Sequence, residues 1–504
     1  MTHLHFSMRH SLFLSKFLAA YIPLLFLLPA KAENLVRKES QEQRDQRMKW
    51  WRDARYGLFI HWGLYAIPAG EWNGKKVWGG GEWIQHCGNI PVADYAALAG
   101  QFNPVKFNAD EWVSMAKKAG IKYIVITAKH HDGFALFATK ASPYNIIDAT
   151  PFKRDILKEL TEACHNQGMP LGFYYSQSQD WHHPGGTAWP FKDRKDVVDH
   201  VPGDMDKYLD SIAVPQVREL LSNYGPNTPA CFWWDTPLEM TPERANKLAD
   251  AVRELRPKII TNGRLAKSGL GGDTANAEQN IPPYGFPGRD WETCMTINGS
   301  WGYKADDQKW KSAGELLRDL IDVAGKGGNF LLNVGPMGDG TIPEPSVDRL
   351  LDVGAWLRTN GDAIYGTTAT PFGPELGAYS PTEKDKKGKP IFVPEWKWRC
   401  TVKPGRLYFI ILEWPHGNFE VHGLKSRVTK VYLLADAEKK GLSFLQQGEE
   451  LSITLPEKQP DPMASVVVAE IDDQVPLTSY PSLKEQEKQA ANQLKSDLGA
   501  PESK

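Results

Sequence analysis

Short apolar segments alternate with helix-like patterns between about residues 45 and 365. The apolar segments are rich in β-branched and aromatic residues, as buried parallel strands are. They lie at 57–61, 123–128, 171–176, 231–235, 258–261, 294–297 and 330–334. Alternating strands and helices favour an α/β fold with a parallel sheet, and about seven or eight such units favour its closure into a (β/α)8-like barrel. An open doubly wound sheet is the alternative, although no Gly-x-Gly-x-x-Gly fingerprint follows the first strand.

Capping signals mark the ends of the predicted helices. Asn108 precedes an acidic first turn with Glu111 three residues later, and Gly120 follows the same segment as a stop signal. Thr241 is followed by Pro242, a residue that is common at the first helical position. The sequence therefore predicts helices that begin after residues 108 and 241.

The pattern changes after about residue 366, where short β segments follow one another without helices. Segments 396–402 and 406–412 flank a Lys-Pro-Gly turn and predict a hairpin, and further β segments lie at 429–434, 451–455 and 465–471. We therefore expect a barrel domain at 33–365, followed by an antiparallel β-sandwich at 366–475. The Lys-rich segment 380–389 and the tail at 476–504 are charged, which is typical of solvated loops and tails.

Composition argues against two classes of partner. The 504 residues include 59 Lys and Arg against 61 Asp and Glu, which gives a net charge of −2. Nucleic acids and anionic membranes are recognised by positive surfaces, so neither is an expected partner. The 18 tryptophans are a high count, and indole rings can stack on the apolar faces of sugars while their N–H groups bond hydroxyls, although core packing accounts for most of them.

The first 32 residues have the features of a secretory signal. Residues 17–28 are largely apolar, and Ala30-Lys31-Ala32 matches the small-x-small cleavage pattern, so we expect a periplasmic or secreted protein. No later segment reaches the about 20 apolar residues of a transmembrane helix, and no membrane anchor is expected. The 5 cysteines are widely spaced and indicate neither a disulfide framework nor a zinc site. The sequence does not predict the oligomeric state.

Polar residues lie at the carboxyl ends of several predicted strands. The first strand ends in His61, the pair His130-His131 follows the second, and Tyr174 lies near the end of the third. Asp235 ends the fourth, and Trp233 lies on the same face because alternate residues of a strand share a face. Barrel enzymes carry their chemistry at this end of the strands, so we expect a polar binding site there.

These residues belong to segments that resemble the α-L-fucosidases of glycoside hydrolase family 29. The segments are GLFIHWG at 57–63, Glu82-Trp83, AKKAGIKYIVITAKHHDGF at 116–134, YYS at 174–176, WWD at 233–235, SWGY at 300–303 and GGNFLLNVGP at 327–336. They span nearly the whole predicted barrel in the order of that family, and the β region after residue 366 fits the family's C-terminal sandwich. The resemblance implies retaining hydrolysis of terminal α-L-fucosyl residues by double displacement, with no metal or other cofactor.

The resemblance also implies roles for individual residues. Asp235, the last residue of WWD, matches the nucleophile. The acid/base is Glu278, in a loop, or Glu292, just before a strand, and Glu278 is favoured. Contacts with the fucose are expected from His61, Glu82, Trp83, His130, His131, Tyr174, Trp233 and Arg264. The expected partner is a fucosylated oligosaccharide or polysaccharide.

Two other functions fit parts of the sequence. A metal-dependent hydrolase could use His130, His131 and Asp132 as ligands, together with the later pair His182-His183. Neighbouring residues on a strand point to opposite faces, however, so the two histidines share a metal only if the strand has ended before them. A non-catalytic fucose-binding or carbohydrate-binding protein on the same scaffold is the other alternative, and the presence of Asp235 together with a candidate acid argues against it.

Overall fold

Eight parallel strands form a barrel in the computed structural model, which describes residues 39–187, 204–267, 272–386 and 388–497. The strands are β1 (Tyr56–Ile60), β4 (Tyr123–Lys129), β5 (Leu171–Tyr175), β6 (Cys231–Trp234), β7 (Ile260–Thr261), β8 (Ala275–Glu278), β9 (Trp291–Thr296) and β10 (Asn329–Val334). Their hydrogen-bonded order is β7-β6-β5-β4-β1-β10-β9-β8. A parallel bridge between Asn262 and Thr274 joins the two ends of this order, so the sheet closes and the predicted (β/α)8-like barrel is confirmed.

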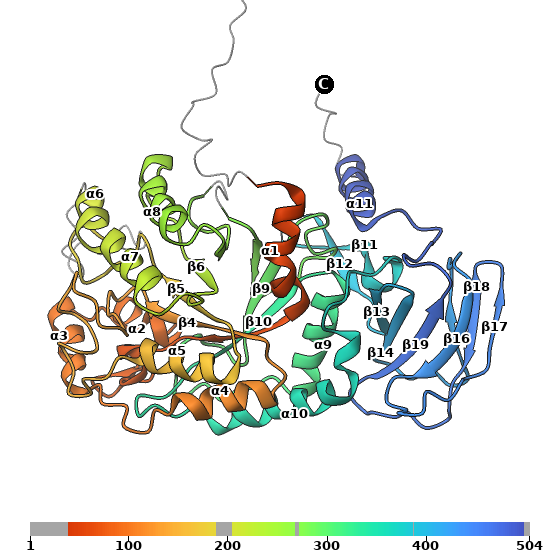
Figure 1. Ribbon diagram of the computed structural model, residues 1–504, viewed down its shortest axis with the longest axis horizontal. Helices are drawn as coiled ribbons and strands as arrows, with labels where there is room; N and C mark the ends of the chain where they lie inside the picture. The colour runs from red at the N-terminus through yellow and green to blue at the C-terminus, as the bar shows by residue number, and fades with distance from the viewer. Residues whose placement is uncertain (1–38, 188–203, 268–271, 387, 498–504) are drawn as a thin grey trace, which may run out of the picture.

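Helices cover the outside of the barrel between most successive strands (Figure 1). They are α4 (Ala109–Lys118), α5 (Ile156–Gln167), α6 (Met205–Tyr208), α7 (Val214–Ser222), α8 (Pro242–Leu255), α9 (Ala313–Gly325) and α10 (Glu344–Asn360). The side chains of Asn108 and Thr241 accept hydrogen bonds from the backbones of Glu111 and Arg244, so both predicted N-caps are confirmed. No described residue between β7 and β9 is helical, which leaves that side of the barrel without a covering helix of its own.

The amino-terminal opening of the barrel is closed by α1 (Gln41–Ala54), which directly precedes β1. Met48 and Trp51 of this helix are buried in one apolar cluster with Tyr123 and other residues of the barrel interior. The ring of Trp50 meets Tyr123 edge to face at 6.3 Å. The barrel interior is therefore sealed at the end opposite to the predicted site.

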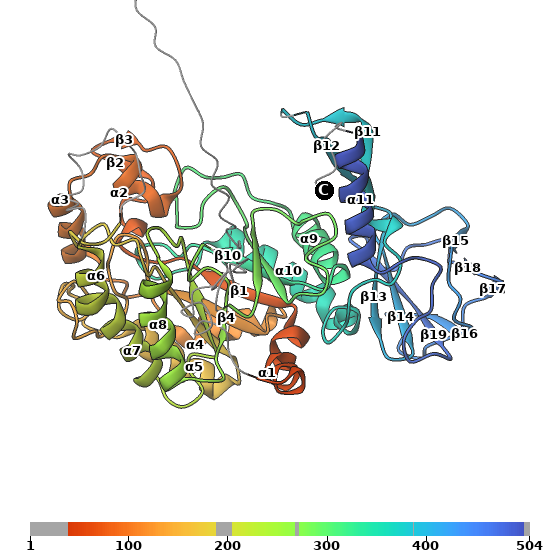
Figure 2. The same ribbon diagram turned by 90° about the horizontal axis from the view of Figure 1, so that it is seen from above.

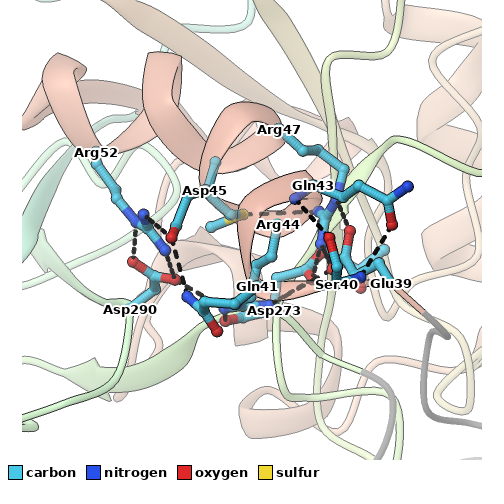
Figure 3. Close-up of polar contacts among 12 residues, drawn as sticks. Glu39, Ser40, Gln41, Gln43, Arg44, Asp45, Arg47, Arg52, Asp273 and Asp290 are labelled. Carbon is cyan, nitrogen blue, oxygen red and sulfur yellow. Dashed lines mark hydrogen bonds and ion pairs between the residues drawn. The ribbon is translucent and has the colours of Figure 1, made fainter.

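Ion pairs fix α1 to the two loops that lack a helix (Figure 3). Arg44 and Arg52 contact Asp290, just before β9, at 2.7 and 2.6 Å. Arg44 and Arg47 contact Asp273, just before β8, at 3.2 and 2.8 Å. Partly buried pairs such as these are screened by salt less than surface pairs. The helix thus takes the place of the missing helices at the base of β8 and β9.

A long connection follows β1 on the other side of the barrel. It contains the small hairpin of β2 (Glu71–Trp72) and β3 (Lys75–Lys76) and the short helices α2 (Ile84–Cys87) and α3 (Val92–Ala96). Figure 2 shows these elements at the end of the barrel that points away from the C-terminal domain.

In the described part of the C-terminal domain, two antiparallel sheets share a buried apolar cluster, which confirms the predicted β-sandwich. One sheet contains β13 (Trp398–Lys403), β14 (Arg406–Ile411), β19 (Ser465–Ile471) and β16 (Val428–Leu433), and the other contains β15 (Asn418–Val421), β18 (Glu450–Thr454) and β17 (Phe444–Gln447). Arg399 of β13 is buried and pairs with Asp322 of α9 at 2.6 Å. This ion pair joins the sandwich to the barrel.

Three segments differ from the sequence prediction. The sequence does not predict β8, and it places a charged loop at 380–389 where the hairpin of β11 (Gly377–Lys384) and β12 (Pro390–Pro394) lies. The segment predicted as a charged tail contains α11 (Leu483–Asp497), and Gln486 of this helix donates a hydrogen bond to the carbonyl of Phe372 at 2.6 Å. Among the described helices none is long and apolar enough to cross a membrane. The predicted signal segment 1–32 lies outside the described residues.

Candidate active site

The predicted polar site is a cavity at the carboxyl ends of the barrel strands. His61 directly follows β1, and both His130 and His131 follow the last residue of β4. The strand has ended at this point, so the two imidazoles both face the cavity, with ring centroids 4.1 Å apart. The residues that line the cavity are Phe59, His61, Trp83, His130, His131, Tyr174, Trp233, Asp235, Thr236, Arg264, Glu278, Cys294 and Trp301.

Asp235 lies one residue beyond β6, and both of its carboxylate oxygens are bound. Tyr174 Oη donates to Oδ2 at 2.8 Å, and Arg264 Nη1 donates to Oδ1 at 3.0 Å. The backbone N–H of Asp235 donates to Gln177 Oε1 at 2.9 Å, and Gln177 Nε2 donates to the carbonyl of Arg264 at 2.9 Å. The carboxylate is therefore held in one orientation, with 14% of the side chain exposed to the cavity.

Arg264 connects Asp235 to Glu278. While Nη1 binds Asp235, Nη2 contacts Glu278 Oε2 at 2.8 Å. The guanidinium group also lies over the ring of Trp233, at 4.8 Å from its centroid. Glu278 is the last residue of β8, not a loop residue as the sequence predicts, and its side chain is 43% exposed. Two carboxylates of different exposure thus meet at one fixed cation.

Glu292 occupies a deeper level of the barrel and does not line the cavity. It lies within β9, not before a strand, and accepts hydrogen bonds from Tyr123 Oη at 2.5 Å and Trp233 Nε1 at 3.0 Å. Burial raises the pKa of this carboxyl to about 6, even though the hydrogen bonds from Tyr123 and Trp233 act to lower it. Glu292 therefore supports the Trp233 wall from below, and Glu278 is the glutamate that faces the cavity.

The hydrogen bonds of His61 define its tautomer. Nδ1 of His61 is 2.7 Å from Asn333 Oδ1, and Asn333 Nδ2 donates to the carbonyl of Trp301 at 2.7 Å. The amide orientation of Asn333 follows from the second contact, so His61 Nδ1 carries the proton and Nε2 is left as an acceptor. Burial lowers the pKa of His61 to about 4, so the ring is neutral at physiological pH.

His131 is fixed in the same tautomer. The hydroxyl of Ser176 donates to the carbonyl of Gln179 at 2.9 Å, so its oxygen accepts from His131 Nδ1 at 2.7 Å. His131 Nε2 then lies 3.6 Å from Asp235 Oδ2. Burial lowers the pKa of His131 well below its usual value, and the nearby charge of Lys129 lowers it further. Among the described residues that line the cavity, neutral imidazoles thus lie beside one cationic side chain, Arg264.

Glu82 is the predicted fucose-contacting residue that does not line the cavity. It is buried and accepts hydrogen bonds from the backbone N–H of Gly302 at 2.8 Å and from the hydroxyl of Ser300 at 3.4 Å. Burial raises the pKa of this carboxyl. Glu82 therefore holds the turn that carries Trp301, whose ring lies 5.1 Å from that of His61 in the cavity wall.

Three further residues of the site, Phe59, Gln177 and Trp301, are not marked by the sequence patterns. Phe59 lies two residues before His61, and the alternation of side chains along a strand is the signal that could have found it. Gln177 follows the end of β5 and Trp301 belongs to the SWGY segment, but their contacts depend on neighbours far away in the chain.

Comparison with known proteins assigns the family. Residues 28–362 match the family model described as Alpha-L-fucosidase. The chain belongs to the α-L-fucosidase family. It is 32% identical over 346 residues to an α-L-fucosidase from Dictyostelium discoideum, an alignment that covers 63% of this chain and 71% of the relative.

Solved structures of α-L-fucosidases share the fold. α-L-Fucosidase isoenzyme 1 from Paenibacillus thiaminolyticus superimposes with a TM-score of 0.72 and 36% identity, covering 86% of this chain and 100% of that protein. A mutant of an α-L-fucosidase from Lactobacillus casei, in complex with 4-nitrophenyl α-L-fucopyranoside substrate, has a TM-score of 0.58 and 39% identity over 63% of this chain and 99% of its own. Membership of this family therefore supports the interpretation of the protein as a glycoside hydrolase, and not as a metal-dependent hydrolase or a non-catalytic binding protein.

Proposed function

We propose that this protein hydrolyses terminal α-L-fucosyl residues with retention of configuration, with Asp235 as nucleophile and Glu278 as acid/base. The observation that carries the proposal is the pair of carboxylates bound to one guanidinium at the carboxyl ends of β6 and β8. Retaining glycosidases need two carboxyl groups about 5 to 5.5 Å apart, one that attacks and one that transfers a proton.

In the first step an oxygen of Asp235 attacks the anomeric carbon while Glu278 gives its proton to the glycosidic oxygen. The bond between the anomeric carbon and that oxygen breaks, the leaving group departs as an alcohol, and a covalent fucosyl-enzyme remains. In the second step Glu278 removes a proton from water, the water oxygen bonds to the anomeric carbon, and the carboxylate of Asp235 is released. Before the attack, Arg264 and Tyr174 donate to the two oxygens of Asp235 and so orient the carboxylate for the first step.

The neutral histidines provide sites for the sugar hydroxyls. His61 Nε2 is an acceptor because Nδ1 donates to Asn333, and it can receive a hydroxyl proton without adding charge beside Asp235. The rings of Phe59, Trp301 and Trp233 supply apolar surface for the C–H groups and the C5 methyl group of fucose. His130, His131 and Trp83 complete the predicted contacts from the same lining.

Hydrolysis of an aryl α-L-fucoside tests the proposal. We expect release of the aryl alcohol by the wild-type protein, with α-L-fucose as the first sugar anomer detected by NMR. Asp235→Asn removes the nucleophile and should abolish turnover on every substrate. Glu278→Gln should slow poor leaving groups by about 10²- to 10⁴-fold, the usual scale of acid/base catalysis, and good leaving groups much less. Release of β-L-fucose first, or full activity of Asp235→Asn, would refute the assignment.

We also propose that residues 1–32 direct the protein to the periplasm or out of the cell, where it meets fucosylated oligosaccharides or polysaccharides. The apolar segment 17–28 and the Ala-Lys-Ala sequence at 30–32 support this proposal. Amino-terminal sequencing of the native protein should begin near Glu33. An intact Met1 on protein from the cytoplasmic fraction would contradict it.

A further inference from the structure

A solvent-exposed tryptophan, Trp78, lies between β3 and the short 3-10 helix Gly81–Trp83, five residues before Trp83 of the cavity lining. Trp78 is 65% exposed and is the only aromatic residue among the large apolar side chains that the described part of the chain exposes. A single exposed apolar residue is common on protein surfaces. The fixed backbone around Trp78 and its proximity to the cavity distinguish it from such residues.

Lys304 anchors the backbone on both sides of Trp78. Its Nζ donates to the carbonyl of Val77 at 3.0 Å and to that of Gly79 at 3.1 Å. Lys304 directly follows the turn that carries Trp301 of the cavity wall. The backbone on both sides of Trp78 is thus held in place, so a ligand that covers the indole has little backbone freedom left to restrict.

The glycines after Trp78 allow the loop to lie directly on that turn. Gly79 has a φ of +86°, in the left-handed region that favours glycine. A Cβ atom at Gly80 would lie 2.3 Å from Glu82 Oε1, so no larger residue fits there. The backbone N–H of Gly81 donates to the hydroxyl of Ser300 at 2.7 Å. The loop is thus fixed against the cavity wall while the indole of Trp78 faces solvent.

We propose that Trp78 is the stacking platform for the sugar that carries the fucose, on the leaving-group side of the scissile bond. This inference rests on the proposed fucosidase function and adds the substrate class: oligosaccharides in which fucose is attached to another pyranose. Trp83 and Trp301 line the cavity, and the Trp78 loop is bound to the turn that carries Trp301, so a leaving group that passes these two rings meets this loop. A pyranose offers a flat face of C–H groups that matches an indole ring.

The test compares a substrate without a second sugar with substrates that have one. α-L-Fucosyl fluoride has no sugar ring in its leaving group. Fucosyl disaccharides of galactose and N-acetylglucosamine, in each available linkage, have a pyranose as the leaving group. We expect Trp78→Ala to leave kcat/KM for the fluoride within about twofold and to lower kcat/KM for the best disaccharide by about fivefold, the scale of one aromatic contact. Trp78→Phe should retain most disaccharide activity.

Leu445→Ala serves as the matched control, because Leu445 is 58% exposed on the C-terminal domain. It should change neither activity. An equal loss of fluoride and disaccharide activity in Trp78→Ala, or no loss on any disaccharide, would overturn the platform while the proposed function stands. Wild-type protein that cleaves neither class of compound would overturn the proposed function and the platform with it.

Discussion

Replacing Glu292 by glutamine should remove a pH dependence from the stability of the barrel. Burial raises the pKa of this carboxyl from 4.5 to about 6 in the folded protein, against the hydrogen bonds from Tyr123 and Trp233. In the unfolded chain the group regains its ordinary value. At about 1.4 kcal/mol per pH unit, this difference corresponds to about 2 kcal/mol of unfolding free energy.

The sign follows from the raised pKa. Below pH 4.5 the carboxyl of Glu292 is protonated in both states, and burial of the neutral group carries no ionisation cost. Between pH 4.5 and about 6 the unfolded chain loses its proton first, so the free energy of unfolding falls as the pH rises. Above about pH 6 the loss is complete. Glutamine has nearly the same size, can accept from Trp233 Nε1 and does not titrate.

Thermal unfolding of both proteins between pH 4 and pH 7.5 measures the effect. As the pH rises, the Tm of the wild type should fall relative to that of Glu292→Gln. For a barrel of this size we expect this relative fall to be about 2 to 4 °C. Activity on α-L-fucosyl fluoride should stay within about tenfold of wild type. Tm curves that run parallel would refute the raised pKa. A loss of about 10²-fold or more on a fucosyl disaccharide, whose poor leaving group needs a proton, would move the acid/base role from Glu278 to Glu292.

Three further variants test other contacts. Asn333→Ala releases the proton of His61 Nδ1 from its acceptor, and kcat/KM for an aryl fucoside should fall by about 10- to 100-fold because both tautomers become available. Asp290→Asn weakens two ion pairs of α1 and should lower the Tm of the barrel by a few degrees, on the order of 1–2 kcal/mol, with fluoride turnover at 25 °C unchanged. Arg399→Met leaves Asp322 buried with one fewer cation and should destabilise the protein by about 3 kcal/mol in calorimetry; an unchanged melting profile would contradict this role.

The apolar strands of the barrel could be predicted because their own residues carry the signal. β4 is buried along its whole length, and its sequence Tyr-Ile-Val-Ile-Thr-Ala-Lys is mostly β-branched or aromatic. β8 could not be predicted in the same way, since Ala275–Glu278 reads Ala-Asn-Ala-Glu and has no apolar pattern. It is a strand because β9 pairs along it and because Thr274 closes the barrel against Asn262. These contacts come from residues outside the segment, so the sequence of the segment itself does not reveal the strand.

The sequence ranks Glu278 above Glu292 only by resemblance, and correct bounds for β9 would have given this ranking a structural reason. The sequence predicts this strand at 294–297, which places Glu292 outside it. In the structure β9 is Trp291–Thr296, so Glu292 is near its amino end, two residues below Cys294 of the cavity lining. Glu278 pairs in register with Cys294 at the carboxyl end of β8. Both candidates are glutamates. Glu278 lies in the cavity because it is at the carboxyl end of its strand, and Glu292 lies beneath the cavity because it is near the amino end of its strand.

The position of Glu82 could not be predicted from its segment. Its partners, Ser300 and Gly302, lie more than two hundred residues further along the chain, and the motif shows only that a carboxylate precedes Trp83. A buried carboxylate needs donors, and here it finds them in the backbone of a turn. Glu82 thus meets a structural need, the fixing of Trp301, while Trp83 of the same motif lines the cavity.

The sealed base of the barrel and the chemistry at its other end are connected through the same interior. α1 closes the amino-terminal opening, and its Trp50 meets Tyr123, the residue that donates a hydrogen bond to Glu292. Glu292 in turn holds the indole N–H of Trp233, and Arg264 lies over the face of that indole. Exclusion of water at the base is therefore what keeps the pKa of Glu292 high. The Glu292→Gln variant should consequently lose its stability advantage at neutral pH when α1 is loosened by Asp290→Asn, since water that enters the base would solvate the wild-type carboxylate and remove its penalty. Measured Tm differences for the two single variants and the double variant at pH 7.5 would decide this: strict additivity would show that the base of the barrel and the support of the sugar pocket are independent.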